Sequence, residues 1–308
     1  MIVIATNQFD ASSSDVMGWL DGESVLRINS DNFQTHAQAN QVNHDFSRPL
    51  TSIDSIWFRK GSKVKFDLEN ENDQLLRHCT DELIALNSFY FCSSLTTKTL
   101  GTTETLRVTK LCILQSLKRH LLEIPPTLVT NTKSKLIDFK NEHGELIIKP
   151  LSDGAKFEIE GQMYKIYTEI LTDRVFNQLG DKFFPTLFQK RIRKKYEIRS
   201  FVLEGEIYSM ALIESKKDLD SVDIRYSSHN EVVRSVPYQL PYEIEVRMVE
   251  VMKSLKLDTG SFDIIKAIDN NYYFLEINPS GQFGDLSYMC NYYLEEKISK
   301  YLKDGDNI

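Results

Sequence analysis

The sequence predicts a mixed α/β (α+β) fold, and three features of the chain support this. Short apolar strands alternate with helical segments up to about residue 100. Further along, the apolar strand "ELIIK" ends at Lys149-Pro150. Near the C-terminus, "GSFDIIKAID" and "NYYFLEIN" predict a hairpin of two apolar strands. Strands alternating with helices are typical of α/β architectures.

Length and composition indicate a globular protein of one to three domains. The 308 residues are 41% apolar and 26% charged, which is enough for a sizeable core. The 37 Lys and Arg and 44 Asp and Glu give a formal net charge of −7. We therefore expect no nucleic-acid partner and no binding to membrane surfaces.

Several missing sequence features indicate the cellular compartment and argue against a zinc site. The four cysteines are scattered without a CxxC pair, which argues for free thiols and against a zinc site or a disulfide frame. No apolar run approaches the ~20 residues that span a bilayer. The N-terminus has no basic region of the kind that begins a signal peptide. We therefore expect a cytoplasmic protein.

The first hundred residues predict a small α/β domain. "MIVIA", "SVLRIN" and "SIDSIWF" predict three strands, and Val16–Leu20 and residues 71–95 have helical patterns. No GxGxxG motif occurs, so a dinucleotide site has no support.

The middle of the chain predicts two helices separated by a strand. A helix of about five turns in "TTETLRVTKLCILQSLKRHLLE" ends before Pro125-Pro126, which forces an extended exit. Asn131 or Thr132 can cap the next helix, and Gly144 sits where that helix ends. After the "ELIIK" strand, residues 168–180 predict another helix.

The last part of the chain predicts mostly antiparallel structure. "TLFQKRIRKKYEIRSFVLEGEIYSMALIES" predicts two strands joined at Glu204-Gly205. Residues 241–256 predict an amphipathic helix, followed by the hairpin and a helix around Leu294–Leu302.

The C-terminal hairpin predicts a metal site. If Asn270-Asn271 form a two-residue turn, Asp263 lies opposite Asn278, and Glu276 shares their face. Three oxygen donors on one face suit Mg²⁺, which shares its coordination shell with water and substrate phosphates. The alternative is a solvated acidic face, and a slip of one residue removes Asp263 from the set.

A magnesium ion with so few protein ligands implies a bound nucleotide, and lysines elsewhere must contact its phosphates. Neither a GxxxxGK[ST] loop nor the kinase motif set occurs. Lys149, at the end of an apolar strand, is either a phosphate ligand or an edge lysine with its charge in water. Lys110 is a second candidate, and its alternative is an ordinary surface lysine.

A basic stretch from Gln189 to Arg199 leads into an apolar strand. A solvated edge strand is the plain interpretation. However, Glu197 inside a basic row and Arg199 at the start of an apolar strand suit nucleotide binding better. A carboxylate can accept ribose hydroxyls, and a guanidinium can bind phosphate or carboxylate through two bonds.

These motifs, taken in order, resemble the ATP-grasp superfamily, which includes D-alanine–D-alanine ligases and glutathione synthetases. The resemblance covers roughly residues 100–290: a strand ending in Lys-Pro, "FQ" followed by "EIR", Asp263, and "EINPSGQFG". It implies an ATP-grasp fold with an N-terminal Rossmann-like α/β domain, a central small domain and a C-terminal domain, with ATP between the last two. On this chain the domains correspond to residues 1–100, 101–187 and 188–308.

The resemblance also implies roles for individual residues. The lysines that grip the ATP phosphates correspond to Lys110 and Lys149, and the ribose carboxylate corresponds to Glu197. Arg199 and Arg225 correspond to the arginines that face the γ-phosphate and the acylphosphate. The adenine hinge corresponds to Gln189, Lys190, Arg191 and Ile192, and the Mg²⁺ ligands to Asp263, Glu276 and Asn278.

Within the superfamily, the chain most resembles the maturases of ribosomal peptides of the microviridin and grasp-with-spasm types. The stretches that carry this resemblance are "SIWFRKGS", "KLCILQSLKRHLLEIPPTLVTN", "FQKRIRKKYEIR", "VDIRYSS" and "EINPSGQFGDLSYMCNYYLEEKISKYL". One departure is Asp223-Ile224-Arg225, where such proteins often have Asp-Trp-Arg.

The narrower resemblance implies a function, partners and cofactors. It implies a ligase that uses ATP and Mg²⁺ to activate Asp or Glu side chains of a precursor peptide as acylphosphates. Thr, Ser or Lys side chains of the same peptide then form ester or amide rings. The expected partners are the precursor peptide and, as a homodimer, a second copy of the chain.

Two other functions stay open at this point. The same ATP site suits a ligase that joins an amino acid to a small molecule or to a protein terminus. A degenerate ATP-grasp fold retained as a peptide-binding module is the non-enzymatic alternative. The complete set of candidate ligands and lysines argues against that second alternative.

The proposed metal ligands lead to a first prediction. Glu276→Ala should lower turnover by orders of magnitude, on the scale of ~3 kcal/mol or more of transition-state stabilisation. Its ATP-dependent product formation should be measured beside that of the unaltered protein. Near-normal product formation by the variant would refute the assignment.

Overall fold

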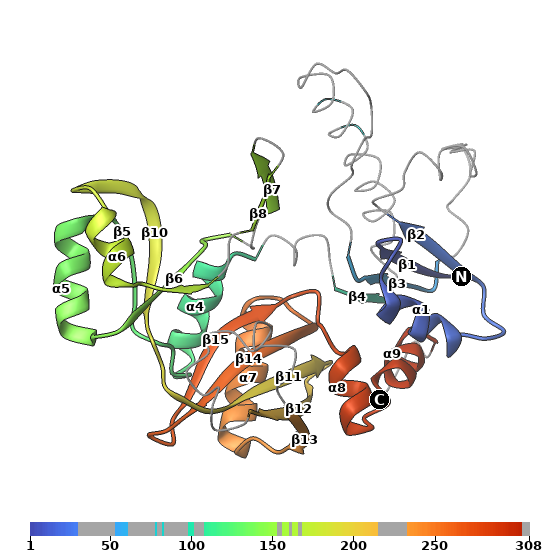
Figure 1. The fold of residues 1–308 in the computed structure, drawn as a ribbon. Helices are drawn as coiled ribbons and strands as arrows, with labels where there is room; N and C mark the ends of the chain where they lie inside the picture. The colour runs from blue at the N-terminus through green and yellow to red at the C-terminus, as the bar shows by residue number, and fades with distance from the viewer. Residues whose placement is uncertain are drawn as a thin grey trace.

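The computed structural model describes residues 1–29, 53–60, 78, 82, 98–101, 108–152, 156–159, 162–165, 168–214 and 233–303. Figure 1 shows three main sheets along the molecule, with the N-terminal sheet and the sheet that contains β10 at opposite ends. No helix in this described part of the chain is long and apolar enough to cross a membrane.

The N-terminal sheet is parallel, with the strand order β2-β1-β3-β4. Both of its faces are buried, because Ile2, Ile4 and Trp57 enter one apolar cluster while Val3 and Ile56 enter another. This explains the nearly continuous apolar run of "MIVIA", since strands of parallel sheets are covered on both sides. The elements are β1 (Ile2–Thr6), α1 (Ala11–Gly18), β2 (Val25–Asn29), β3 (Ser55–Phe58) and β4 (Lys98–Leu100).

The second sheet is antiparallel, with the order β5-β10-β6-β9, and it carries its own small core. Leu136, Leu146, Leu171 and Phe188 form this core. Its strands are β5 (Thr127–Thr132), β6 (Leu146–Lys149), β9 (Glu169–Ile170) and β10 (Lys182–Lys190). The other elements of this region are α4 (Lys110–Arg119), α5 (Lys133–His143), α6 (Asp173–Gln178) and the hairpin of β7 (Lys156–Ile159) and β8 (Gln162–Lys165).

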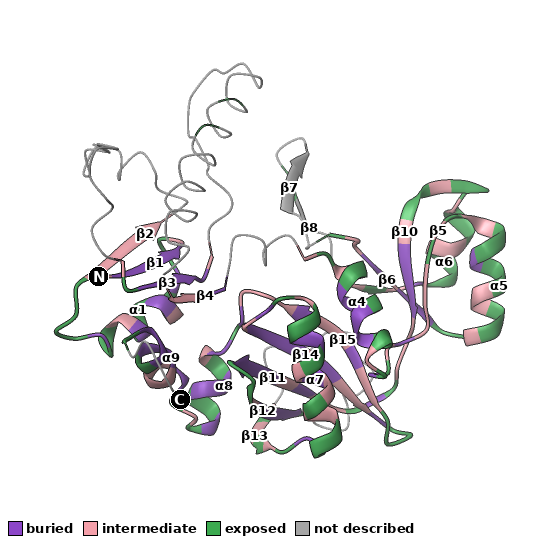
Figure 2. Cartoon of the chain, turned by 180° about the vertical axis from the view of Figure 1, so that it is seen from behind, coloured by how far each residue is buried: buried purple, intermediate pink, exposed green. Residues whose placement is uncertain are grey.

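The third sheet has five antiparallel strands in the order β13-β12-β11-β14-β15. One face packs on α4 and α7, as the burial colours of Figure 2 indicate. Its strands are β11 (Lys194–Leu203), β12 (Glu206–Ile213), β13 (Arg234–Tyr238), β14 (Thr259–Ala267) and β15 (Tyr272–Asn278). The helices are α7 (Tyr242–Ser254), α8 (Gly284–Cys290) and α9 (Leu294–Lys303).

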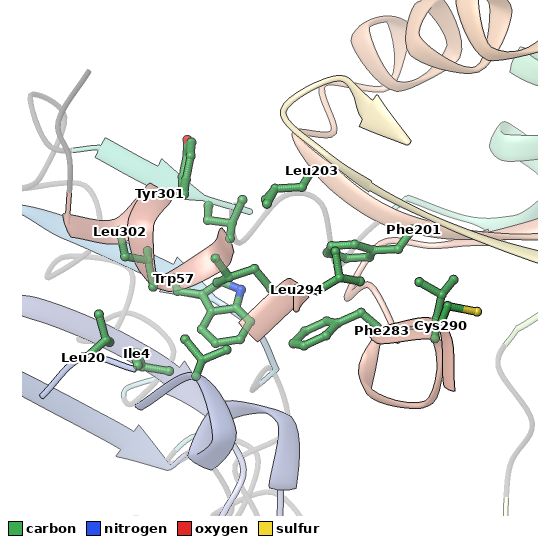
Figure 3. Packing of buried hydrophobic residues seen from close by; sticks show 14 of the residues in the cluster. Ile4, Leu20, Trp57, Phe201, Leu203, Phe283, Cys290, Leu294, Tyr301 and Leu302 are labelled. Carbon is green, nitrogen blue, oxygen red and sulfur yellow. The ribbon is translucent and has the colours of Figure 1, made fainter. Parts of the chain in front are cut away.

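The other face of the third sheet shares one apolar core with the N-terminal sheet. Trp57 from β3, Phe201 from β11 and Phe283 before α8 meet in this core, with α9 beside them (Figure 3). The ring centroids of Phe201 and Phe283 are 5.1 Å apart, and those of Trp57 and Phe283 are 6.3 Å apart. The first and last parts of the chain therefore fold as neighbours.

Most expected elements appear in the structure. Gly144 ends α5 with φ of 77°, and Glu204-Gly205 turn between β11 and β12 with φ of 50° and 87°. The helical pattern at 71–95 lies outside the described residues, apart from residues 78 and 82. The basic stretch is not one strand, because β10 ends at Lys190 and β11 begins at Lys194. No prediction included α8.

Strand β10 crosses the domain boundary that was expected after residue 187. Strand β10 pairs with β5 and β6 up to Lys190, so the change of sheet falls within Arg191–Arg193. At the other end, α8 and α9 pack on the core shared with the N-terminal sheet. The three-domain division at residues 100 and 187 stays a prediction.

Asp258 ties the N-terminal sheet to the third sheet. The backbone N–H of Gly101, just after β4, donates to Oδ1 and Oδ2 of Asp258 at 2.8 and 2.9 Å. Burial raises the pKa of the Asp258 carboxyl from 3.8 to about 6, and nearby Glu204 adds to the rise. The bond from Gly101 acts in the opposite direction but does not outweigh the burial.

A pH dependence of stability follows from this raised pKa. The folded protein holds the Asp258 proton to a higher pH than the unfolded chain, so its contribution is full below 3.8 and is lost as the pH rises through about 6. The loss is at most ~3 kcal/mol in the free energy of unfolding. Asp258→Asn should remove this step while keeping an acceptor for Gly101, and thermal unfolding from pH 3.5 to about 7 measures it.

Asp173→Asn is the control for this measurement. Its carboxylate is exposed, and the bond from Lys140 lowers its pKa, which is the opposite direction to the shift of Asp258. The control should keep the profile of the unaltered protein. An unchanged step in Asp258→Asn would show that another group causes it.

Candidate active site

The chain crosses from the second to the third sheet through Arg191–Arg193, and backbone bonds hold this crossing on both sides. The amides of Lys190 and Arg191 donate to Pro126 O and Glu145 O at 2.9 and 2.8 Å. From the third sheet, the amide of Ile268 donates to Arg193 O at 3.1 Å. The predicted adenine hinge, Gln189 to Ile192, therefore lies at the junction of two sheets.

The side chain of Gln189 is buried at this junction. Its Nε2 donates to Thr127 Oγ1 at 2.9 Å. Its Oε1 is also buried and has no hydrogen-bond partner in the described part of the chain. A buried acceptor without a partner is costly, so this side chain is held at a cost in stability. Beside it, Arg191 Nη1 lies 3.6 Å from Glu145 Oε2.

The predicted hairpin forms, but its turn lies elsewhere. The amide of Asn270 donates to Ala267 O at 3.0 Å, and the amide of Ala267 donates to Asn271 O at 3.0 Å. Asn270 has φ of 69°, a left-handed conformation that asparagine tolerates. The predicted two-residue Asn270-Asn271 turn is therefore wrong, and Lys266 pairs with Tyr272.

A β-bulge in β15 nevertheless places Asp263 and Glu276 on the same face of the hairpin. Ile264 pairs with Phe274, but the next residue, Asp263, pairs with Glu276, so β15 contains one extra residue, Leu275. Without the bulge, the observed turn would place Asp263 opposite Leu275, on the wrong face. With it, Asp263 and Glu276 are direct neighbours across the two strands.

Asn278 completes the row of oxygen donors at the end of β15. It is two residues after Glu276 and therefore shares its face, and it pairs with Ser261. Its Oδ1 accepts from the amide of Ser280 at 3.0 Å, and its carbonyl accepts from the amide of Gly281 at 3.0 Å. The turn after the strand thus fixes the orientation of the Asn278 carboxamide.

Cationic side chains lie against both carboxylates. Arg199 on β11 pairs with Asp263 across the strands, and its Nε lies 3.6 Å from Asp263 Oδ1. Lys110, the first residue of α4, has its Nζ 3.7 Å from Glu276 Oε2 and 3.3 Å from Pro150 O. The contact with Pro150 brings Lys110 to the end of β6. Four predicted site residues from three regions of the chain therefore meet.

Lys149 lies nearby but is more deeply buried. It ends β6, pairs with Leu187 on β10, and is 7% exposed. It is thus not a surface lysine. A buried ammonium next to Pro150, which Lys110 contacts, agrees with the predicted phosphate ligand, and that role stays a prediction.

Glu197, the predicted ribose ligand, belongs to a buried charge network. Lys194 Nζ lies 2.8 Å from Glu197 Oε1 and 2.9 Å from Glu214 Oε1. Burial lowers the pKa of the Lys194 ammonium, but the two glutamates outweigh this and raise it above its usual value. Lys194 is therefore charged, and it holds the carboxylate of Glu197 in one place.

One predicted site residue cannot be placed. Arg225, with the Asp223-Ile224-Arg225 segment around it, lies outside the described residues. Its role toward an acylphosphate stays a prediction.

The residues present fit a magnesium ion. Asp263, Glu276 and Asn278 offer carboxylate and amide oxygens, which Mg²⁺ prefers. The side chains of Asp263 and Glu276 are 41% and 36% exposed, so a hydrated cation can reach them. Within the described ranges, no group of three or more His, Cys, Asp and Glu gathers. With two carboxylates and an amide, such a site relies on substrate phosphates for its remaining ligands.

Sequence reasoning missed two groups of residues around this site. The pairing of Lys194 with Glu197 and Glu214 was not predicted, although the sequence places Glu197 three residues after Lys194. Arg59, whose guanidinium donates to the carbonyls of Ser280 and Gly281, was also missed. No local pattern in the sequence indicates a contact over such a distance along the chain.

Comparisons with known proteins identify the fold. No protein-family model matches the chain, and no curated protein matches it. Among solved structures, the macrocyclase MdnC of Microcystis aeruginosa MRC, bound with precursor peptide MdnA, matches with a TM-score of 0.80. The sequence identity is 24%, and the match covers 98% of this chain and 99% of that one.

Two further ligases match over similar lengths. A RiPP-associated ATP-grasp ligase of Chryseobacterium gregarium, in complex with ADP and a leader and core peptide, has a TM-score of 0.74 and 22% identity, covering 98% and 94% of the chains. The ATP-grasp ligase PsnB, complexed with a precursor variant, Mg and ADP, has a TM-score of 0.76 and 18% identity, covering 98% and 97%. The chain thus has the ATP-grasp fold, which confirms the expected fold.

The network around Lys194 gives a prediction for stability. Lys194→Met removes the ammonium that neutralises two carboxylates and should lower the free energy of unfolding by ~3–5 kcal/mol, the usual cost of breaking a buried pair. Urea unfolding at neutral pH measures the change.

The adjacent Lys195 provides a matched control, because its side chain is exposed. Lys195→Met should change the free energy of unfolding by about 0.5 kcal/mol or less. Equal stability of the two variants would mean that the Lys194 network contributes nothing measurable.

Proposed function

We propose that this chain is an ATP-dependent carboxylate ligase that forms ester or amide rings within a ribosomal precursor peptide. One observation carries the proposal: Lys110, Arg199, Asp263 and Glu276 lie in contact between the third sheet and the end of β6. Such a group of paired charges suits the transfer of a phosphoryl group, where catalysis depends on positioning and charge stabilisation.

ATP fits between the second and third sheets, as the resemblance implies. Gln189, Lys190, Arg191 and Ile192 hold the base, mainly through their backbone. Glu197, oriented by Lys194, accepts the ribose hydroxyls. Lys110 and Lys149 bind the phosphates. The proposed base site lies where the chain crosses between the two sheets. The two lysines lie at the start of α4 and at the end of β6.

Magnesium is the second cofactor of the proposal. Asp263, Glu276 and Asn278 hold it, and PsnB, which has the same fold, is complexed with Mg and ADP. When bound, it neutralises phosphate charge and orients the reacting groups. The pairing of Asp263 with Arg199 and of Glu276 with Lys110 keeps both carboxylates in place before a cation arrives.

The chemistry that these residues support has two steps. An Asp or Glu carboxylate of the peptide attacks the γ-phosphorus of ATP, so a carboxylate–phosphate bond forms and ADP leaves. Lys110, Lys149 and Arg199 stabilise this approach of two anions. A Thr or Ser hydroxyl, or a Lys amine, of the same peptide then attacks the acyl carbon. Phosphate leaves, and the proton of the nucleophile is released.

The peptide substrate is proposed from the structures with the same fold. The macrocyclase MdnC is bound with a precursor peptide, and the Chryseobacterium gregarium ligase with a leader and core peptide. Arg225 is proposed to face the acylphosphate. A homodimer and a cytoplasmic location complete the proposal, together with the absence of nucleic-acid and membrane partners.

The test is co-expression with a candidate precursor peptide, taken from any small open reading frame that lies beside the gene, followed by mass spectrometry of the peptide. Each ring should lower the peptide mass by about 18 Da, the mass of one water. Glu276→Ala should give unmodified peptide. Glu250→Ala, which alters an exposed glutamate on α7, should give the same rings as the unaltered protein.

Other outcomes decide between functions. ATP-dependent addition of an amino acid to a small molecule or a protein terminus, with no ring in the peptide, would indicate the other ligase. Peptide binding without ATP turnover would indicate a peptide-binding module. Either result would overturn the proposal.

A further inference from the structure

The turn that follows the candidate metal ligand Asn278 is held by the N-terminal domain. Arg59, directly after β3, donates from Nη1 to the carbonyl of Ser280 and, at 2.6 Å, to the carbonyl of Gly281. Its guanidinium also lies over the ring of Phe283, 5.4 Å from the centroid. One side chain therefore contacts three positions in the short segment between Asn278 and α8.

Arg59 is itself held in a buried network. It is 2% exposed, and its Nε lies 3.4 Å from Asp10 Oδ2. Asp10 also accepts from Thr6 at 3.0 Å, from Ser13, and from Lys60 at 2.8 Å. Burial raises the pKa of Asp10, but Arg59, Lys60 and Ser13 outweigh it and bring the pKa to about 2. The pair is therefore charged at neutral pH.

The bound segment has little freedom of its own. Gly281 has φ of 62°, and a Cβ at this position would lie 2.7 Å from Phe201 Cε2. The carbonyl of Gln282 accepts from Ser261 Oγ at 2.9 Å. The amides of Ser280 and Gly281, whose carbonyls Arg59 binds, are the ones that donate to Asn278. One peptide unit links Arg59 to Asn278 directly: the unit between Ser280 and Gly281 accepts from Arg59 through its carbonyl and donates to the Asn278 carbonyl through its amide.

We infer that Arg59 is a positioning residue for the candidate metal site, which it orients through the Ser280–Gly281 turn. The inference rests on the proposed function, because it takes Asn278 as a Mg²⁺ ligand. Groups that hold metal ligands in place tune metal affinity even though they do not touch the metal. On this inference, the docking of the N-terminal domain sets the affinity for the cation.

A purely structural role is the alternative. Removing one partner of a buried Arg–Asp pair destabilises a fold whether or not a metal binds nearby. The two roles differ in one observable quantity, which is the affinity for the cation in a protein that is still folded.

The experiment measures binding of Mn²⁺, as a spectroscopic substitute for Mg²⁺, by electron paramagnetic resonance in the presence of ADP. Arg59→Met should weaken Mn²⁺ binding by about tenfold to a hundredfold, as is usual when a group that orients metal ligands is removed. ADP binding without metal, measured by calorimetry, should stay unchanged. Arg59→Lys should weaken Mn²⁺ binding less, since an ammonium can still donate to one of the two carbonyls.

Two further variants separate positioning from stability. Arg27→Met removes another arginine of the N-terminal domain that donates to a backbone carbonyl, that of Asn7, at 2.8 Å, but it does not contact the turn. Its Mn²⁺ affinity should equal that of the unaltered protein. Asp10→Asn combined with Arg59→Met removes the buried carboxylate that has lost one of its two cationic partners, so thermal stability should partly recover while the Mn²⁺ affinity stays low.

The outcomes are distinct. If the unaltered protein binds no Mn²⁺ with ADP, the metal site of the proposed function fails, and this inference fails with it. If it binds Mn²⁺ and Glu276→Ala does not, the site stands, and equal affinity in the Arg59 variants overturns the inference alone. Should Arg59→Met not fold, Arg59→Lys decides: weakened binding supports positioning, and unchanged binding overturns it.

Discussion

Two carboxylates side by side on adjacent strands are the constraint on which this site depends. Asp263 and Glu276 are direct neighbours across β14 and β15, and like charges in such pairs repel. The fold offsets this repulsion by bringing Arg199 from the next strand and Lys110 from the start of α4. Because Lys110 also contacts Pro150, this compensation of charge holds α4, the end of β6 and the third sheet together.

A second constraint is that the end of β15, which carries Asn278, is supported by residues from other parts of the chain. The segment after Asn278 turns directly into the core shared by the N-terminal sheet, α8 and α9. Two hydrogen-bonded contacts join the N-terminal sheet to the third sheet and the segment after it. Arg59 donates to the carbonyls of Ser280 and Gly281, and the amide of Gly101 donates to Asp258. The N-terminal sheet therefore supports the candidate site, although the sequence of this region shows no motif of nucleotide binding.

Sequence reasoning found what is encoded locally and missed what depends on contacts between distant parts of the chain. Apolar runs and turn residues predicted β1, β3, α5 and the hairpin of β14 and β15. The common face of Asp263, Glu276 and Asn278 was also predicted, but from a turn that is wrong; the bulge at Leu275 offset that error. Lys194 and Arg59 resembled ordinary basic residues, because their burial arises from Glu214 and from the segment after Asn278. No single sequence reveals such pairings before the fold is known.

The bulge also limits how this hairpin can change in evolution. Successive side chains of a strand point to opposite faces of the sheet. A change of one residue between the hairpin turn and the site would therefore move the candidate metal ligands of one strand to the other face. Loss or gain of a single residue at the tip is tolerated only together with loss of the bulge or a second change of length. Homologous hairpins should therefore differ in length by even steps, or carry their irregularity at another position along the strand.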